Sequence, residues 1–169
     1  MTSIEASATY RLPPSAWAFG WLCLAAQVLA LLDRGHSSAD APWVLVSMLL
    51  SALVVAWFAR GVLTGARGRT AVVYVLLAIG LLLHAFDAIA SPSALDWLGL
   101  LIALVQLGAL MTYTASDDYQ AMRRAGGARP EAVEHIGALL VVAVLTGALG
   151  GLTADPNGND SPIQLRVGL

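Results

Sequence analysis

The sequence predicts an all-α fold: a polytopic transmembrane helical bundle of five spans. The chain is 58% hydrophobic and 12% charged, with a mean hydropathy of +0.74. A soluble domain carries about a quarter charged residues. The hydrophobic residues fall into five apolar runs of about 20 residues, the length that crosses a bilayer core. Four spans are the alternative, if the glycine-rich last run only enters the membrane.

The first two runs carry helix boundary signals. We expect a helix over 15–32, because Pro14 lies where proline is favoured at a helix start and Gly35 suits a C-terminal cap. A cleavable signal peptide is a weaker alternative, since its apolar region spans only about 7 to 15 residues. The second run covers 42–59 and is expected to end at Arg60-Gly61.

The third and fourth runs form a predicted hairpin. They cover 70–90 and 94–114 and are joined by Ser91-Pro92-Ser93. The spacing of Ser93 and Asp96 is that of a capping box, and a carboxylate in a first helical turn is favoured by the helix dipole. Asp96 therefore has a structural explanation.

The last third divides into a hydrophilic loop, a fifth span and a tail. Residues 117–134 form the loop, and its segment 117–124 is predicted to be a short surface helix ended by Gly126-Gly127. The fifth span starts near His135. The predicted organisation is a cytoplasmic tail over 1–14, a bundle over 15–153 with the inner loop 117–134, and an outer tail over 154–169.

Arginine positions predict the orientation. In a five-span arrangement one side holds Arg11, Arg60, Arg67, Arg69, Arg123, Arg124 and Arg129, and the other side holds Arg34 and Arg166. Cytoplasmic loops are enriched in Lys and Arg, so the N-terminus is predicted to lie inside and the C-terminus outside. The aromatic residues are placed as interfacial belts would be, with Trp17, Trp57, Tyr74 and Tyr113 near the inner boundary and Trp43 and Trp97 near the outer one.

Small and polar residues recur at helical spacing, which predicts the faces that pack, because membrane helices associate through such residues. The predicted stripes are Ala16, Gly20, Cys23, Gln27 and Ala30; Gly80, His84, Asp87 and Ser91; Asp96, Gly99, Ala103, Gln106 and Tyr113; and Ala143, Gly147 and Gly151. Ser47 and Ser51 are expected to bond back to carbonyls of their own helix.

Four residues form a candidate intramembrane polar cluster: Gln27, His84, Asp87 and Gln106. His84 and Gln27 are expected at nearly the same depth in the outer half of the membrane. One interpretation is a protonatable site, in which Asp87 one turn away favours the charged form of His84. The other is a structural histidine bonded to Gln27 or to a backbone carbonyl. Gln106 is expected to bond helix to helix.

Other chemistries are disfavoured by the residues present. A net charge of -2 with scattered arginines excludes nucleic acid, and one cysteine, Cys23, excludes a disulfide or a zinc site built from cysteines. His84 and His135 are expected roughly 20 Å apart, too far for a bis-histidine haem. A metal site from Asp33, His36, Asp40, His84 and Asp87 is a remote alternative. No catalytic residue, cofactor or metal is predicted.

The middle of the chain resembles a known group of membrane proteins. An arginine-glycine turn (Arg67-Gly68-Arg69), a Ser/Pro turn and a Leu/Ala-rich span ending in Tyr113 are similar to the second hairpin of small, uncharacterised four- to five-span integral membrane proteins of the actinobacterial type. The resemblance covers roughly 60–124 and implies the fold only. The fifth span and the tail depart from it.

The expected function is that of a small non-enzymatic integral membrane protein in a bacterial plasma membrane. It would be a structural or accessory subunit that packs against itself or a larger membrane complex, with lipid as its other partner. The alternative is a proton-linked carrier or channel component using His84, Asp87 and Gln27.

Overall fold

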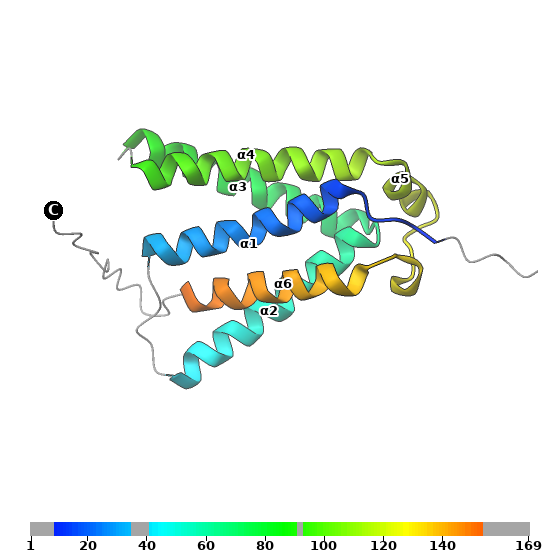
Figure 1. The fold of residues 1–169 in the computed structure, drawn as a ribbon, viewed down its shortest axis with the longest axis horizontal. Coiled ribbons are helices and arrows are strands. Elements are labelled where there is room, and N and C mark those ends of the chain that lie inside the picture. The colour runs from blue at the N-terminus through cyan, green and yellow to red at the C-terminus, as the bar shows by residue number, and fades with distance from the viewer. Residues whose placement is uncertain (1–8, 35–40, 91–92, 154–169) are drawn as a thin grey trace, which may run out of the picture.

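The structure is a computed structural model that describes residues 9–34, 41–90 and 93–153, and these ranges form an all-helical bundle (Figure 1). Its helices are α1 (Pro14–Arg34), α2 (Ala41–Leu63), α3 (Arg67–Ala90), α4 (Ala94–Ala115), the short α5 (Asp117–Arg124) and α6 (Ile136–Thr153), with a 3-10 turn at Pro130–Ala132. All but α5 and the 3-10 turn are long and apolar enough to cross a membrane. The prediction of an all-helical fold is confirmed within these ranges, and the five long apolar helices support a multi-pass membrane protein. The predicted cap at Gly35, the turn residues Ser91 and Pro92, and the tail over 154–169 lie outside the described residues.

The turn between α2 and α3 differs from its prediction. The sequence predicted that α2 ends at Arg60-Gly61, but the helix continues to Leu63. Gly65 takes the left-handed backbone conformation (φ 77°) that ends the helix, and the Ala66 N–H donates to the Gly61 carbonyl at 2.8 Å. Glycine adopts that conformation without steric cost, so Gly65 sets the boundary.

The long helices lie side by side in the order α3, α4, α1, α6 and α2 (Figure 1). The central α1 packs against both α4 and α6. α2 and α3 meet at the turn that joins them and diverge toward their other ends. The bundle is therefore closed at the end that carries the turn and α5. We call this the arginine-rich end, because it brings together Arg11, Arg60, Arg67, Arg69, Arg123, Arg124 and Arg129.

The closest contact in the bundle is between α2 and α6, and small residues make it possible. A methyl group at Gly147 would lie 2.6 Å from Ala52 Cα, and one at Gly151 would lie 2.6 Å from the Met48 backbone N. The predicted small-residue stripe on the last span is thus confirmed as a packing face. The Ser47 hydroxyl donates to the Gly151 carbonyl at 3.1 Å. The expectation that Ser47 bonds within its own helix is wrong, because its hydroxyl donates to a carbonyl of α6.

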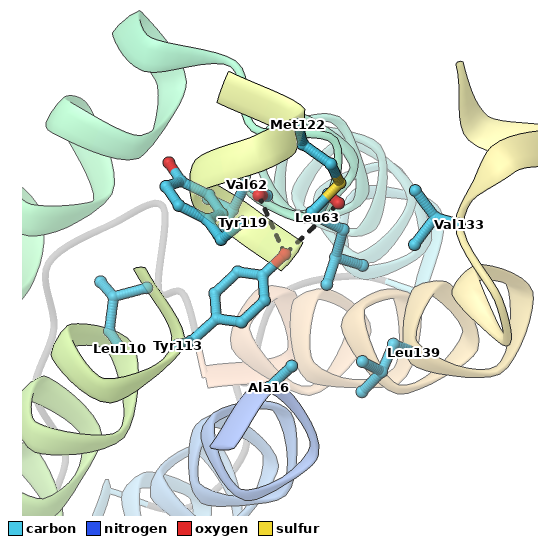
Figure 2. Packing of buried hydrophobic residues seen from close by; sticks show 9 residues of the cluster. All are labelled: Ala16, Val62, Leu63, Leu110, Tyr113, Tyr119, Met122, Val133 and Leu139. Carbon is cyan, nitrogen blue, oxygen red and sulfur yellow. Dashed lines mark hydrogen bonds between the residues drawn. The ribbon is translucent and has the colours of Figure 1, made fainter. Parts of the chain in front are cut away.

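Tyr113 and Tyr119 form the centre of the buried core at the arginine-rich end (Figure 2). Their rings meet edge to face at 5.1 Å. The Tyr113 hydroxyl donates to the Val62 and Leu63 carbonyls, which lie at the end of α2, where helical carbonyls lack partners. Tyr113 is almost fully buried, so its placement in an interfacial aromatic belt was wrong. α5 covers this core with Tyr119 and Met122.

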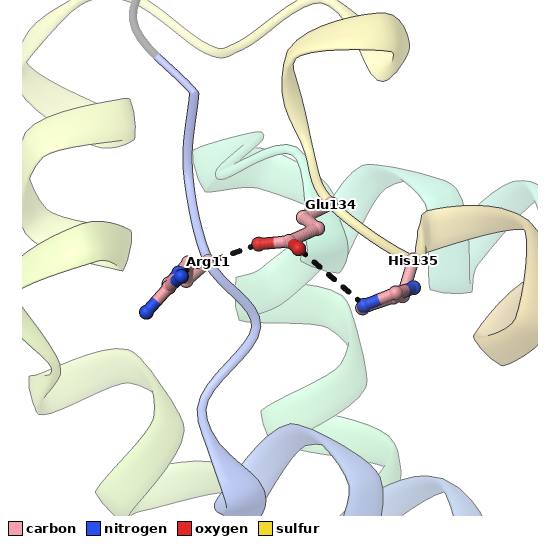
Figure 3. Close-up of polar contacts among 3 residues, drawn as sticks. All are labelled: Arg11, Glu134 and His135. Atoms are coloured by element: carbon pink, nitrogen blue, oxygen red, sulfur yellow. Dashed lines mark ion pairs between the residues drawn. The ribbon is translucent and has the colours of Figure 1, made fainter.

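The segment before α1 is tied to the segment before α6. The Tyr10 N–H donates to the Ala132 carbonyl at 2.8 Å, and the Glu134 N–H donates to the Tyr10 carbonyl at 2.9 Å. The Glu134 carboxylate also pairs with Arg11 at 3.4 Å and with His135 at 3.5 Å (Figure 3). These side chains are largely exposed, so the ion pairs contribute little and the backbone bonds make the attachment. The sequence showed no sign of this pairing.

Candidate functional site

The structure places the predicted polar residues in different helix contacts. Gln106 on α4 is 6% exposed, and a side-chain hydrogen bond joins it to Cys23 on α1. It therefore links α1 and α4. Its neighbours on the same face, Gly99, Ala103 and Tyr113, are buried too.

Gln27 lies where three helices meet. A methyl group at Gly150 on α6 would lie 3.2 Å from the Gln27 Oε1 atom and 3.5 Å from the Ser51 Oγ atom on α2. The side chain of Gln27 thus reaches toward the α2–α6 pair. It is half-buried there, beside a glycine that leaves room for its amide.

His84 lies in the contact between α3 and α4. A methyl group at Gly99 would lie 3.2 Å from the His84 Nδ1 atom, so the imidazole packs over the glycine. Among the residues that the structure describes, no hydrogen bond joins His84 to Gln27. The structure therefore does not bring together the two residues that the sequence placed at one depth.

The packing face of α3 is rotated from the predicted stripe. Asp87 is exposed near the C-terminal end of α3, and no atom lies within 4 Å of a methyl group built at Gly80. The side that packs instead carries Leu77, His84 and Ala88. Asp87 therefore shares a helix with His84 without sharing its contact. Ser91, the last member of that stripe, lies outside the described residues.

A basic pocket at the arginine-rich end was missed by the sequence analysis. It has a volume of about 290 Å³ and is lined by Trp57, Arg60, Thr64, Arg69, Ala128 and Pro130. The Arg69 guanidinium stacks on the Trp57 ring at 4.0 Å from its centroid. The signal in the sequence was Trp57 followed by arginines on both sides of a glycine-rich turn. What the sequence did not provide was the third wall, from residues 128–130.

A metal centre has no support in the described residues. Within 9–34, 41–90 and 93–153, no three His, Cys, Asp or Glu side chains come together as a metal site would need. His36 and Asp40, two members of the remote metal-site alternative, lie outside these ranges.

Comparisons with known proteins identify no relative of this chain. No protein-family model, curated protein or solved structure matches it. The functional proposals below therefore rest on the contacts and charges of the chain itself.

Proposed function

We propose that this chain is a small, non-enzymatic membrane subunit that works by packing its helices against a further copy of itself or against a larger membrane complex. The observation that supports this most is that two glycines in the middle of α3 and α4, Gly80 and Gly108, are left uncovered. Among the described residues, no atom of another helix lies within 4 Å of a methyl group built at Gly80 or at Gly108. Small residues let helix backbones approach closely in a membrane. A small residue on a face that contacts only lipid has no such role.

The same proposal accounts for the polar residues inside the spans. Gln106, Gln27 and His84 each lie in a contact between helices, and the three contacts involve different helix pairs. Polar groups distributed in this way favour a packed scaffold, since interhelical bonds in lipid stabilise association. A proton carrier instead needs its titratable groups to share a path across the membrane.

Larger residues at the open glycines test the proposal. We expect the wild-type chain, purified in mild detergent, to appear by native mass spectrometry as an oligomer or with a bound partner. Gly80→Leu and Gly108→Leu should weaken that assembly about tenfold or more while the chain stays folded, because leucine is the better helix former. Gly137→Leu is the matched control, since Gly137 is equally open but lies in the first turn of α6.

A wild-type chain that is monomeric and carries no partner would contradict the proposal. A different result would support the alternative function, a proton-linked carrier. If the reconstituted protein conducts protons, and His84→Ala or Asp87→Ala abolishes that flux in a folded protein, the carrier interpretation replaces the subunit interpretation.

We further propose five full spans in a bacterial plasma membrane, with the arginine-rich end in the cytoplasm. The support is the arginine distribution together with the positive-inside rule. The N-terminus then lies inside and the C-terminus outside.

A further inference from the structure

The basic pocket at the arginine-rich end lies where two helices and a loop meet. Trp57 and Arg60 come from the last turns of α2, Arg69 comes from the first turn of α3, and residues 128–130 close the third side. The Ala128 N–H donates to the Thr64 carbonyl at 3.0 Å, which holds the loop against the turn. This backbone hydrogen bond fixes the third wall of the pocket against the turn between α2 and α3.

Arg69 is fixed in this pocket by three contacts. Its guanidinium stacks on the Trp57 ring, its Nη1–H donates to the Trp57 carbonyl at 3.3 Å, and its aliphatic stem lies directly over Gly61. A guanidinium has five N–H donors in a rigid plane. The single protein hydrogen bond leaves most of them available in an orientation that is already set.

Arg60 supplies a second guanidinium, and within the described residues neither arginine is paired with a carboxylate. In the described part of the chain, salt bridges join Glu134 to Arg11 and to His135, and none involves Arg60 or Arg69. The described residues that line the pocket include no carboxylate. The Thr64 hydroxyl donates to the Arg60 carbonyl at 2.8 Å, so the charged donors among the lining residues are those of the two arginines. Two like charges at one pocket favour a bound anion, and guanidinium matches phosphate geometry.

The position of the pocket along α2 indicates where the anion comes from. The apolar span of α2 ends at Leu63, so Arg60 and the half-exposed Trp57 lie at its boundary, where headgroups are found. Leu53 and Leu49 continue from Trp57 along α2 at four-residue spacing, and both are exposed. An acyl chain can follow these leucines while the phosphate stays in the pocket.

We propose that this pocket binds the phosphate of an anionic phospholipid headgroup. Arg60 and Arg69 donate to the phosphate oxygens, and Trp57 holds the Arg69 plane in place. This site is independent of whether the chain works as a packing subunit.

Lipid binding by the full chain in neutral detergent tests the site. Native mass spectrometry measures adducts as phosphatidylglycerol or phosphatidylcholine is added. We expect the wild type to prefer phosphatidylglycerol, and Arg60→Gln with Arg69→Gln to lower its affinity for that lipid at least tenfold. The matched control is Arg123→Gln with Arg124→Gln, which removes the same charge at the same end but outside the pocket, and should change the affinity less than threefold.

Two further arms separate the possible outcomes. Equal losses in both double variants would overturn the pocket in favour of diffuse surface charge. Inorganic phosphate, added alone, should not bind at millimolar concentration. If it does bind, if the Arg60/Arg69 variant loses that binding, and if the wild type shows no preference between the two lipids, then the pocket is a site for free phosphate and the lipid proposal is overturned. Arg69→Lys keeps the charge but cannot stack as a plane, so it should weaken lipid binding partially. The melting temperature of each variant shows whether it is folded. If the double variant is not folded, Arg60→Gln alone replaces it, because the Arg60 side chain is exposed.

Discussion

At the scale of single residues, the glycines of α6 have different surroundings and different roles in packing. Gly147 and Gly151 lie where the α2 backbone approaches, and Gly150 leaves room for the Gln27 amide. Gly137, near the start of the same helix, has no atom within 4 Å of a methyl group built on it. Glycine lowers the stability of a helix by about 1 kcal/mol relative to alanine. At Gly147 and Gly151 this loss is offset by the close approach of the α2 backbone that glycine allows.

Gly147→Ala is therefore expected to destabilise the bundle. The added methyl would overlap backbone atoms of Ala52, which can move only if the whole of α2 shifts. Overpacking of this kind costs about 1–3 kcal/mol, which exceeds the gain in helix propensity. Thermal unfolding in detergent measures the difference.

Gly137→Ala is the control, and it should be neutral or slightly stabilising because the methyl enters open space. If Gly147→Ala melts no lower than Gly137→Ala, then α2 and α6 are not in close contact.

At the scale of elements, α5 is held as a cover over the core by the hydroxyl of Tyr119. The Tyr119 hydroxyl donates to the Thr70 Oγ1 atom at 2.9 Å, and that hydroxyl donates onward to the Ala66 carbonyl at 3.0 Å. The chain of bonds connects α5 to the start of α3. An eight-residue helix would not be stable alone, so this docking is what keeps α5 folded.

A double-mutant cycle at Tyr119 and Thr70 measures this link. Tyr119→Phe and Thr70→Val should each destabilise by about 1 kcal/mol, and the double variant by less than their sum, because they remove the same buried bond. Thr112→Val is the control partner, since the exposed Thr112 hydroxyl bonds only to the Gly108 carbonyl of its own helix. The effect of Thr112→Val should add to that of Tyr119→Phe. If the effects of Tyr119→Phe and Thr70→Val are also strictly additive, the hydrogen bond between these two side chains is absent in solution.

At the scale of the whole molecule, the two ends of the bundle differ in both packing and charge. The arginine-rich end is closed by α5 and by the segment around Tyr10, and it contains the most buried side chains. At the other end α2 and α3 diverge (Figure 1). The closed, basic end is the one that the positive-inside rule assigns to the cytoplasm.

Cysteine labelling tests that orientation. In a Cys23→Ala background, Ala125→Cys places an exposed thiol at the arginine-rich end, and Leu95→Cys places one in the first turn of α4 at the other end. A membrane-impermeant maleimide should label Leu95→Cys in intact cells and Ala125→Cys only after permeabilisation. The reverse pattern would invert the proposed topology.

Local sequence patterns predicted much of the architecture. The long apolar runs, the Ser93–Asp96 capping box and the short helix before Gly126 all appear in the structure as predicted. Each depends on properties of a few neighbouring residues: hydropathy over one run, a side chain three residues from a helix start, or a glycine after a charged segment. These remain the same whatever the rest of the chain does.

Only the tertiary structure decided which face of each helix meets a neighbour. It turned Asp87 and Gly80 out of the α3 contact, gave Ser47 an acceptor on α6, buried Tyr113, and closed the pocket around Arg69 with residues distant in the sequence. The physical reason is that hydrocarbon solvates every apolar face of a helix almost equally, so hydropathy predicts that a segment spans but hardly which side packs. That choice is made by close fit and by hydrogen bonds between helices, and both depend on the partner helix.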